Sequence, residues 1–475
     1  MNLPDLPARQ LAAMVAGRQV SAREVLDAHL ARIDDANPTV NALVTLTVDE
    51  AREAARRADD HAARGGELGS LHGLPVAHKD LFQTRGVRTT WGSPIYADHV
   101  PSVDALIVTR ARAAGAIAVG KSNTPEFGAG SHTFNAVFGA TTNPWDPTRT
   151  AGGSSGGAAA ALAAGMVPLA DGSDLGGSLR NPANFCGVVG LRPSPGRCPN
   201  PPSTNPFGTM SVAGPMGRHV DDVALFLGAI AGPDPLDPTS IAEPAAPLGA
   251  PCPDRAEILE GLRIAYSPRL GDLPVEAGVA AVIDAAVDAL AAAGARVEEA
   301  DPPLDGADEA FETLRAHQFA MGYGQLYERA SEQMKATVRW NIEAGRALSG
   351  PEVGRAEYLR GRVFTAMAAF FERHDVLVSV VSQVAPFPLD VEYPTEVAGH
   401  PMANYIEWMR SCSRVTVTAC PALSIPAGFS PDGLPVGIQL VAPYRAERRL
   451  LEIGAAVEAV LGASSERPPL RPVAP

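Results

Sequence analysis

Lysine is nearly absent from this sequence of 475 residues. It has three lysines, Lys79, Lys121 and Lys335, among 39 lysines and arginines. Arginine stays protonated at neutral pH, whereas a buried lysine can lose its proton. We therefore expect a retained lysine to do chemistry that arginine cannot do.

Cysteine is also scarce. The five cysteines are odd in number, no two have CxxC spacing, and the histidines are not clustered; they are Cys186, Cys198, Cys252, Cys412 and Cys420. This pattern argues against a disulfide framework or a zinc site and is typical of a reducing compartment. No apolar run reaches the roughly 20 residues of a membrane span. The first ten residues have no basic or apolar region of a signal peptide. We expect a cytoplasmic protein.

Basic side chains are outnumbered, since 39 lysines and arginines face 53 aspartates and glutamates, a net charge of −14. Binding to phosphate groups needs a basic face. We therefore expect neither nucleic acid nor a membrane as partner, and a small molecule as substrate. A prior of about 150 residues per domain suggests three domains. The motifs described below must meet, however, so we predict a single domain over 1–475.

Glycine, by contrast, is concentrated between Gly152 and Arg192, which read GGSSGGAAAALAAGMVPLADGSDLGGSLRNPANFCGVVGLR. Two serine sites flanked by glycine, Ser154 with Ser155 and then Ser178, begin 24 residues apart. Glycine allows the backbone to approach a ligand closely. Consecutive N–H groups over 174–180 can converge on an anion or on a developing oxyanion.

Three other interpretations compete for this stretch. A phosphate-binding P-loop would end in Lys-Ser or Lys-Thr, but no lysine lies between Lys121 and Lys335. Gly152 to Gly156 matches the GxSxG nucleophile elbow, which needs a later acid and histidine. A Ser/Gly turn without chemistry also fits either site alone. An SxxK arrangement is excluded because Val76, Ala118 and Glu332 precede the three lysines by three residues.

Lys79 ends the apolar segment GLPVAHKD, which has the pattern of a buried strand that delivers its last side chains to a site. Burial lowers the pKa of a lysine and supplies a neutral amine as base. The alternative is an ion pair between Lys79 and Asp80 or another acid.

The segments GLPVAHKD, AGGSSGG and SDLGGSLRNPANFCGVVGLRPSPGR, in this order, resemble the amidase signature family of Ser–cis-Ser–Lys hydrolases. The spacings of 75 residues from Lys79 to Ser154 and 24 from Ser154 to Ser178 fit that family. The resemblance covers nearly the whole chain. Leu175 and His78 depart from the usual residues, and neither departure removes a catalytic atom.

The resemblance implies a mechanism. Ser178 is the nucleophile that forms an acyl-enzyme, and Ser154, after a cis Gly153–Ser154 peptide bond, links it to the base Lys79. The implied oxyanion hole consists of the N–H groups of Leu175, Gly176, Gly177 and Ser178. The groups implied to orient this site are Gly153, Ser155, Ser173, Asp174 and Arg180, although an ordinary ion pair fits Arg180 equally well. No metal and no cofactor are implied.

The resemblance also implies an α/β fold, with α/β/α layers around a large, mixed, twisted central sheet. Apolar periodicity independently favours a layered α/β fold. We predict N-terminal helices within 1–65, packed outside the core, at 7–16, 21–36 and 48–64, with Pro38 after the second. The catalytic motifs lie within 73–192. Predicted strands are 74–78, 116–120, 167–170, 262–266, 376–381 and 435–441, and further helices are 103–114, 219–230, 276–294, 352–373 and 446–461.

We expect the substrate pocket to come from the region 310–410, and within it from the segments 310–345 and 383–410, which we place between the predicted helices. These segments are rich in aromatic residues for a chain whose overall aromatic content is 5%. An aromatic-lined pocket suits an aryl or alkyl group. Tyr323, Trp340 and Trp408 are the candidates for substrate binding, against the alternative of ordinary core packing. The sequence thus predicts a monomeric or homodimeric amidase for small linear aryl or alkyl amides, with ester or carbamate hydrolysis as a possible side activity.

A second hypothesis is the amidase component of an aminoacyl-tRNA amidotransferase, which passes ammonia to a partner. Such proteins usually contain the sequence DEFAMG. Here residues 125–130 read PEFGAG. This departure and the aromatic-rich late region favour the free-standing enzyme.

Overall fold

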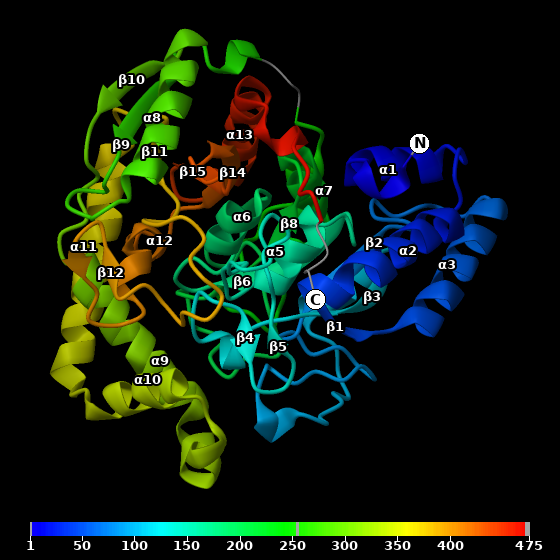
Figure 1. Ribbon diagram of the computed structural model, residues 1–475, viewed down its shortest axis with the longest axis horizontal. Helices are drawn as coiled ribbons and strands as arrows, with labels where there is room; N and C mark the ends of the chain where they lie inside the picture. The colour runs from blue at the N-terminus through cyan, green and yellow to red at the C-terminus, as the bar shows by residue number, and fades with distance from the viewer. Residues whose placement is uncertain (1, 253–255, 471–475) are drawn as a thin grey trace.

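A large mixed β-sheet forms the centre of the computed structural model, which describes residues 2–252 and 256–470 (Figure 1). The order of its 11 strands is β1-β3-β2-β6-β8-β7-β14-β15-β11-β9-β10. The strands are β1 (Leu43–Leu46), β2 (Pro75–Lys79), β3 (Ile117–Ser122), β6 (Leu169–Asp174), β7 (Val189–Arg192), β8 (Val212–Gly217), β9 (Arg263–Ser267), β10 (Arg296–Glu299), β11 (Val376–Val380), β14 (Ala422–Phe429) and β15 (Pro435–Val441). Parallel pairs join β2 to β3 and β6, and β9 to β10 and β11, whereas the other pairs are antiparallel.

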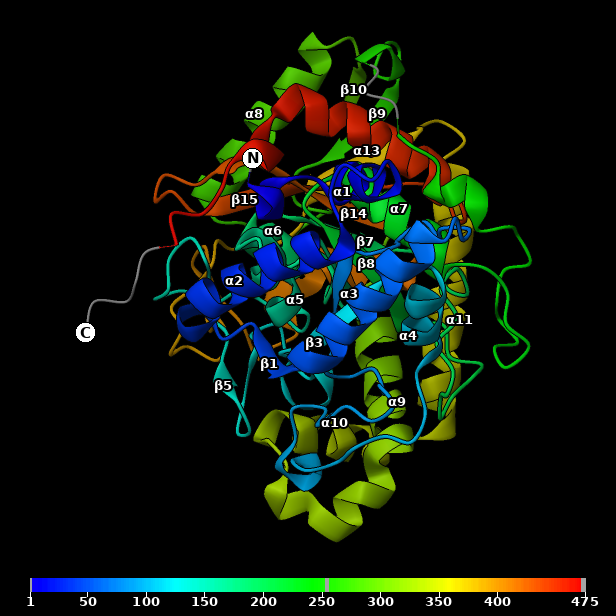
Figure 2. The ribbon, with the colours of Figure 1, turned by 90° about the vertical axis from the view of Figure 1, so that its right-hand side faces the viewer.

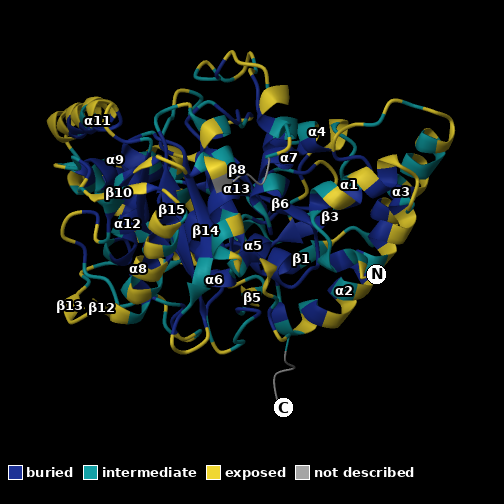
Figure 3. Ribbon diagram, turned by 90° about the horizontal axis from the view of Figure 1, so that it is seen from above, coloured by how far each residue is buried: buried dark blue, intermediate teal, exposed yellow. Residues whose placement is uncertain are grey.

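Helices cover both faces of the sheet (Figures 1 and 3). They are α1 (Ala8–Ala16), α2 (Ala22–Val40), α3 (Val48–Ala63), α4 (Leu106–Ala113), α5 (Gly156–Ala163), α6 (Arg180–Cys186), α7 (Val220–Ile230), α8 (Ala277–Ala292), α9 (Ala307–Ala330), α10 (Ala336–Ala347), α11 (Gly350–Phe370), α12 (Arg410–Val417) and α13 (Glu447–Leu461). Two short hairpins, β4 (Phe134–Asn135) with β5 (Gly139–Ala140) and β12 (Glu396–Val397) with β13 (His400–Pro401), lie outside the sheet. The predicted layered α/β fold is confirmed.

The side chains of each strand point alternately to the two faces of the sheet, and this explains why helices cover both faces. On β2, Val76 packs into the apolar cluster under α1, α4, α7, α8 and α13, whereas Ala77 packs into the cluster under α2 and α5. On β14, Leu423 faces the first cluster and Ala422 faces a third cluster, shared with α9, α11 and α12. Successive side chains of a strand point to opposite faces. The strands in the centre are therefore apolar on both sides, as a sheet covered by two helical layers requires.

Two sequence predictions about local structure were wrong. Pro38 does not separate the second helix from its connection, because α2 continues to Val40 and ends at Asn41, whose φ is 52°. A proline in the last turn removes a single N–H donor at a point where the helix is about to end. Residues 310–345, expected to lie between helices, are themselves mostly helical in α9 and α10.

Helices α9, α10 and α11 form an insertion between β10 and β11. In Figures 1 and 2, α9 and α10 extend beyond the sheet beside the loops that follow β2. Glu126 joins the two parts, since its carboxylate accepts a hydrogen bond from Ser93 Oγ at 2.6 Å and from the N–H of Lys335, at the start of α10, at 2.6 Å. In the part of the chain that the structure describes, no helix is long and apolar enough to span a membrane.

Candidate active site

Lys79 is the last residue of β2 and is completely buried. Its ammonium nitrogen lies 2.7 Å from Ser154 Oγ, 2.9 Å from Ser155 Oγ and 3.1 Å from Ser173 Oγ. Ser173 belongs to β6, the strand beside β2, so the sheet brings it to this position. Three hydroxyl groups therefore surround one amine.

Burial lowers the pKa of Lys79 to about 7, against the opposing influence of Asp174 and Asp171. Neither acid forms an ion pair with the amine. Asp171 instead accepts the backbone N–H of Lys79 at 2.7 Å and contacts the His78 ring. The carboxylate of Asp80 accepts hydrogen bonds from the N–H and the hydroxyl of Thr90. The alternative of an ion pair between Lys79 and Asp80 therefore does not describe the structure.

Ser154 and Ser155 immediately precede α5, and the Gly153–Ser154 peptide bond is cis. Every residue of α5 is buried, so the helix packs tightly against its surroundings. A Cβ on Gly157 would lie 2.2 Å from the backbone nitrogen of Asn123, just after β3. Only glycine permits this approach. The glycines after the first serine pair thus let α5 hold both hydroxyls against Lys79.

The loop 175–179 connects β6 to α6 and is organised by Asp174. Its Oδ1 accepts the N–H of Gly177 at 2.9 Å, and its Oδ2 accepts the N–H of Leu179 at 3.1 Å. The N–H of Gly177 is therefore already occupied, which argues against its predicted place in an oxyanion hole. The N–H groups of Leu175, Gly176 and Ser178 donate to no acceptor within the described residues. These three remain as candidate donors.

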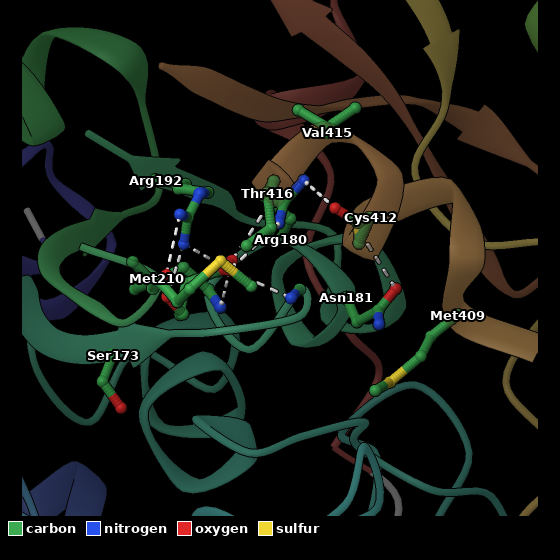
Figure 4. A network of polar contacts seen from close by, with 12 residues as sticks. Ser173, Arg180, Asn181, Arg192, Met210, Met409, Cys412, Val415 and Thr416 are labelled. Carbon is green, nitrogen blue, oxygen red and sulfur yellow. Dashed lines mark hydrogen bonds and ion pairs between the residues drawn. The ribbon is translucent and has the colours of Figure 1, made fainter. Parts of the chain in front are cut away.

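Two buried arginines hold the Asp174 carboxylate in place. Arg180 lies 3.0 Å and Arg192 3.1 Å from its Oδ1. Burial alone would raise the pKa of Asp174, but the two guanidinium groups hold this pKa below its usual range. Arg180 also donates to the Cys412 carbonyl, to Thr416 and to Gln439 (Figure 4). The network fastens the 175–179 loop to α12 and β15.

Sequence reasoning missed Arg192, although a signal was present. Arg192 ends an apolar strand, as Lys79 does, and its side chain is fully buried. It also donates to the Met210 carbonyl at 2.9 Å. For both Lys79 and Arg192, a charged residue at the carboxyl end of a buried strand thus indicates a residue of the candidate site.

Ser154, Ser173 and Ser178 line one cavity of about 540 Å³. One wall is aromatic, because Phe127 and Phe319 pack there with partly buried Trp91 and Tyr96. Other lining residues come from the loop before β8, from the first residues of β8 and from 236–239. The serines therefore face a space large enough for a small organic molecule.

Of the three predicted substrate-binding aromatics, the structure places Tyr323 in the cavity lining. Trp408 is 0% exposed and packs between Phe185 and Phe387 in the core. Trp340 is 42% exposed and packs on Tyr405. Neither tryptophan lines the cavity, because local aromatic content does not fix the direction in which a side chain points. Trp91, Tyr96 and Phe127 line it instead, from loops after β2 and β3.

No group of three or more histidine, cysteine, aspartate or glutamate side chains suited to a metal ion occurs within 2–252 and 256–470. The five cysteines are free. Burial raises the pKa of Cys186 above its usual range and that of Cys412, which packs beside Gly177, to about 12.

Comparison with known proteins gives consistent matches. The family model "Amidase" matches residues 24–451. An acylamidase of Rhodococcus erythropolis is 36% identical, over 98% of this chain and 98% of that protein. A glutamyl-tRNA(Gln) amidotransferase subunit of Acidothermus cellulolyticus is 39% identical, over 95% and 93%. The crystal structure of a bacterial aryl acylamidase of the amidase signature family superposes with a TM-score of 0.88 at 27% identity, over 98% of this chain and 99% of the other.

Proposed function

Because this chain belongs to the Amidase family and is an amidohydrolase, we propose that it cleaves the C–N bond of small linear aryl or alkyl amides. The reaction proceeds through an acyl-enzyme on Ser178, and esters or carbamates can follow the same route. The observation that carries the proposal is the contact of 2.7 Å between a deprotonatable Lys79 and Ser154, in the cavity that Ser178 also lines.

In the first step, neutral Lys79 accepts the proton of Ser154 while Ser154 accepts the proton of Ser178. Ser178 Oγ then attacks the carbonyl carbon and forms a C–O bond, and the carbonyl oxygen becomes an oxyanion. The N–H groups of Leu175, Gly176 and Ser178 stabilise this charge. Donors fixed in advance cost no reorganisation during the reaction. Asp174 keeps them fixed by holding the N–H groups of Gly177 and Leu179.

In the second step, the C–N bond breaks. The proton held as Lys79 ammonium returns through Ser154 to the leaving nitrogen, which departs as a neutral amine. A water molecule then attacks the acyl-enzyme with Lys79 again as base, and the acid leaves while Ser178 regains its proton. Ser155 and Ser173 orient the lysine throughout, since both hydroxyls contact its nitrogen.

The aromatic wall supports the substrate class. Phe127 and Tyr323 pack with ring centroids 4.6 Å apart, and Phe319 lies beside Tyr323 at 5.7 Å. Aromatic surfaces of this kind favour a planar or apolar substituent through burial of area and ring packing. The aryl acylamidase with similar structure is consistent with this choice.

Labelling with a fluorophosphonate tests the assignment of the nucleophile. Both candidate serines lie in one tryptic peptide, residues 150–180, so fragment ions must locate the adduct. We expect the adduct on Ser178 in the wild type and no adduct in Ser178→Ala. A stable adduct on Ser154 would overturn the assignment and restore the nucleophile-elbow interpretation.

The second candidate function is that of a component of an amidotransferase complex, which the similarity to the Acidothermus cellulolyticus protein supports. Size-exclusion chromatography and an assay of the purified chain alone separate the two. A free-standing amidase elutes as a monomer or homodimer and hydrolyses acetanilides without a partner. An amidotransferase component leaves acetanilides intact and becomes active only with its partner proteins.

A further inference from the structure

Arg315 is a buried cation in the wall of the catalytic cavity. It lies on α9, its relative exposure is 4%, and it lines the same cavity as Ser154 and Ser178. The other charged residue in that lining is Asp237, which accepts hydrogen bonds from the N–H and the hydroxyl of Thr239. No ion pair within 4.0 Å joins Arg315 to any acid of the described chain.

The other buried arginines show that a buried arginine without an acidic partner or a set of carbonyl acceptors is unusual in this protein. A buried cation normally has a carboxylate or several carbonyl groups to compensate its lost hydration. Arg180, Arg192 and Arg197 pair with Asp174 or Glu447, and Arg218 donates to the carbonyls of Leu6, Leu162 and Val167. Arg315 has neither kind of compensation.

Its protein contacts are neutral. Nε donates to Asn341 Oδ1 at 3.2 Å, and Nη2 donates to the Tyr405 hydroxyl at 2.5 Å. The guanidinium carbon lies 4.7 Å from the centre of the Phe319 ring and 5.5 Å from that of Tyr405. These contacts fix the plane of the guanidinium group. An oriented cation between aromatic rings has lost much of its freedom before any ligand arrives.

The third nitrogen, Nη1, donates to no acceptor of the described chain, and it is not among the polar atoms sealed from solvent without a partner. Nη1 therefore keeps some solvent-accessible surface, on a residue that lines the cavity. A guanidinium with a free edge matches the two oxygens of a carboxylate, and such charge-assisted hydrogen bonds are the strong ones. The surrounding aromatic wall strengthens the attraction by excluding water.

We propose that Arg315 binds a carboxylate of the substrate, so that the preferred substrates are amides with an acid group in the acyl or the amine part. This inference rests on the proposed function and narrows its substrate class. Arg315 is then a specificity residue: it attracts one chemical class into the cavity, while the serines and Lys79 perform the reaction.

Two matched pairs of substrates test it. In the acyl pair, the 4-nitroanilide of succinic acid with its free carboxylate is compared with the corresponding terminal carboxamide, through release of 4-nitroaniline. In the amine pair, 4-acetamidobenzoate is compared with 4-acetamidobenzamide, through release of acetate. The two members of each pair have nearly the same shape, but one carries a negative charge and two acceptor oxygens where the other carries a neutral amide. We expect the wild type to favour the carboxylate member of at least one pair, and that pair identifies the part of the substrate that carries the acid.

The variant Arg315→Gln should lower kcat/KM for the favoured carboxylate substrate by about 10- to 100-fold, as expected for loss of hydrogen bonds to a charged group. The same variant should change kcat/KM for the carboxamide substrate by no more than about threefold. Arg315→Lys should restore part of the preference for the carboxylate substrate because it keeps the charge. Arg329→Gln, on the exposed end of the same helix, is the matched control and should change neither member.

Equal rates for both members of both pairs in the wild type would overturn the inference, as would an equal loss for both members in Arg315→Gln. If Arg315→Gln does not fold, the comparison of the pairs on the wild type still decides. Calorimetric binding of benzoate against benzamide to Ser178→Ala is an independent measurement, in which tighter benzoate binding is expected. Failure to hydrolyse any of the four amides, together with no label on Ser178, would instead refute the proposed function itself.

Discussion

The amine of Lys79 lies 2.7 Å from the hydroxyl of Ser154, and no carboxylate of the described chain lies within 4.0 Å of that amine. A lysine paired with an acid would hold its proton. One surrounded by hydroxyl groups in a buried site releases it near neutral pH, as the lowered pKa of about 7 shows. The predictions below test this arrangement and its surroundings.

Lys79→Arg should reduce kcat by roughly 10²- to 10⁴-fold, because arginine keeps its charge and cannot act as a base. Steady-state hydrolysis of an anilide measures the loss, and an ester should suffer less because its leaving group needs less proton donation. Lys335→Arg is the control, since Lys335 pairs with Glu392 and can do so as arginine. Near-normal activity of a folded Lys79→Arg would contradict the lysine-base mechanism.

Lys121→Arg is not a suitable second control for Lys79→Arg. Lys121 is fully buried and contacts the Phe82 carbonyl and the hydroxyls of Thr84 and Thr89. A larger guanidinium would disturb this packed site, so we expect reduced stability instead of reduced chemistry.

The pH dependence of kcat/KM should follow the ionisation of Lys79. Its pKa is lowered to about 7, so the active neutral form disappears as the pH falls through that value. At pH 6 the rate should be about a tenth of its alkaline plateau. A profile measured from pH 5 to 9 with a neutral anilide shows this limb. A flat profile over that range would be incompatible with Lys79 as base.

Asp174→Asn should lower both stability and activity. The substitution removes the carboxylate that Arg180 and Arg192 share and weakens the acceptor of the Gly177 and Leu179 N–H groups. Loss of a buried partner of this kind costs on the order of 3–5 kcal/mol of unfolding free energy. Urea denaturation measures the change. Glu53→Gln, in the exposed pair with Arg56, should leave the denaturation midpoint unaltered; equal effects of both changes would refute the assigned role of Asp174.

Tyr323→Ala should raise KM for aryl amides, because Tyr323 lines the cavity, and should lower the unfolding free energy less than loss of a fully buried tryptophan, because Tyr323 is only partly buried. Trp408→Ala should instead destabilise the protein by about 3–5 kcal/mol, as large-to-small changes of core aromatics do. Trp340→Ala, half-exposed and outside the cavity lining, should change neither quantity. An increase of KM in Trp340→Ala without one in Tyr323→Ala would show that the pocket is elsewhere.

Activity should survive dialysis against EDTA. The proposed base is a lysine, and the proposed electrophilic groups are backbone N–H donors, so no step of the mechanism calls on a metal ion. Loss of activity that a divalent ion restores would disprove this mechanism.

The sequence predicted the layered fold and identified Lys79, Ser154 and Ser178 as candidate catalytic residues, because each of the three has a recognisable local sequence. A buried strand ends in a rare lysine, and glycines flank both serines. The structure places Lys79 beside Ser154 and brings Ser154 and Ser178 into one cavity. Their catalytic roles stay predictions until they are measured.

The pocket could not be predicted in the same way. Trp340 and Trp408 lie in an aromatic-rich region, yet the rotation of a helix about its axis decides which side chains face a cavity, and only packing fixes that rotation. The sequence also could not show that the N–H of Gly177 is occupied, since this depends on how Arg180 and Arg192 orient the Asp174 carboxylate. Arg315 is also invisible to the sequence, because only the structure shows that this buried cation has neutral contacts and no carboxylate partner among the described residues.

The chain leaves the sheet after its edge strand β10, forms the insertion of α9, α10 and α11, and returns to the sheet at β11. The insertion supplies Arg315, Phe319 and Tyr323 to the cavity wall, whereas β2, the segment just before α5 and the loop between β6 and α6 supply the proposed reacting groups. One part of the cavity wall is thus encoded in a stretch of the gene separate from the proposed reacting groups, although Trp91, Tyr96 and Phe127 of the same wall lie among the catalytic motifs. Recombination or directed evolution confined to codons 307–370 can therefore change this part of the cavity wall while Lys79, Ser154 and Ser178 stay unaltered.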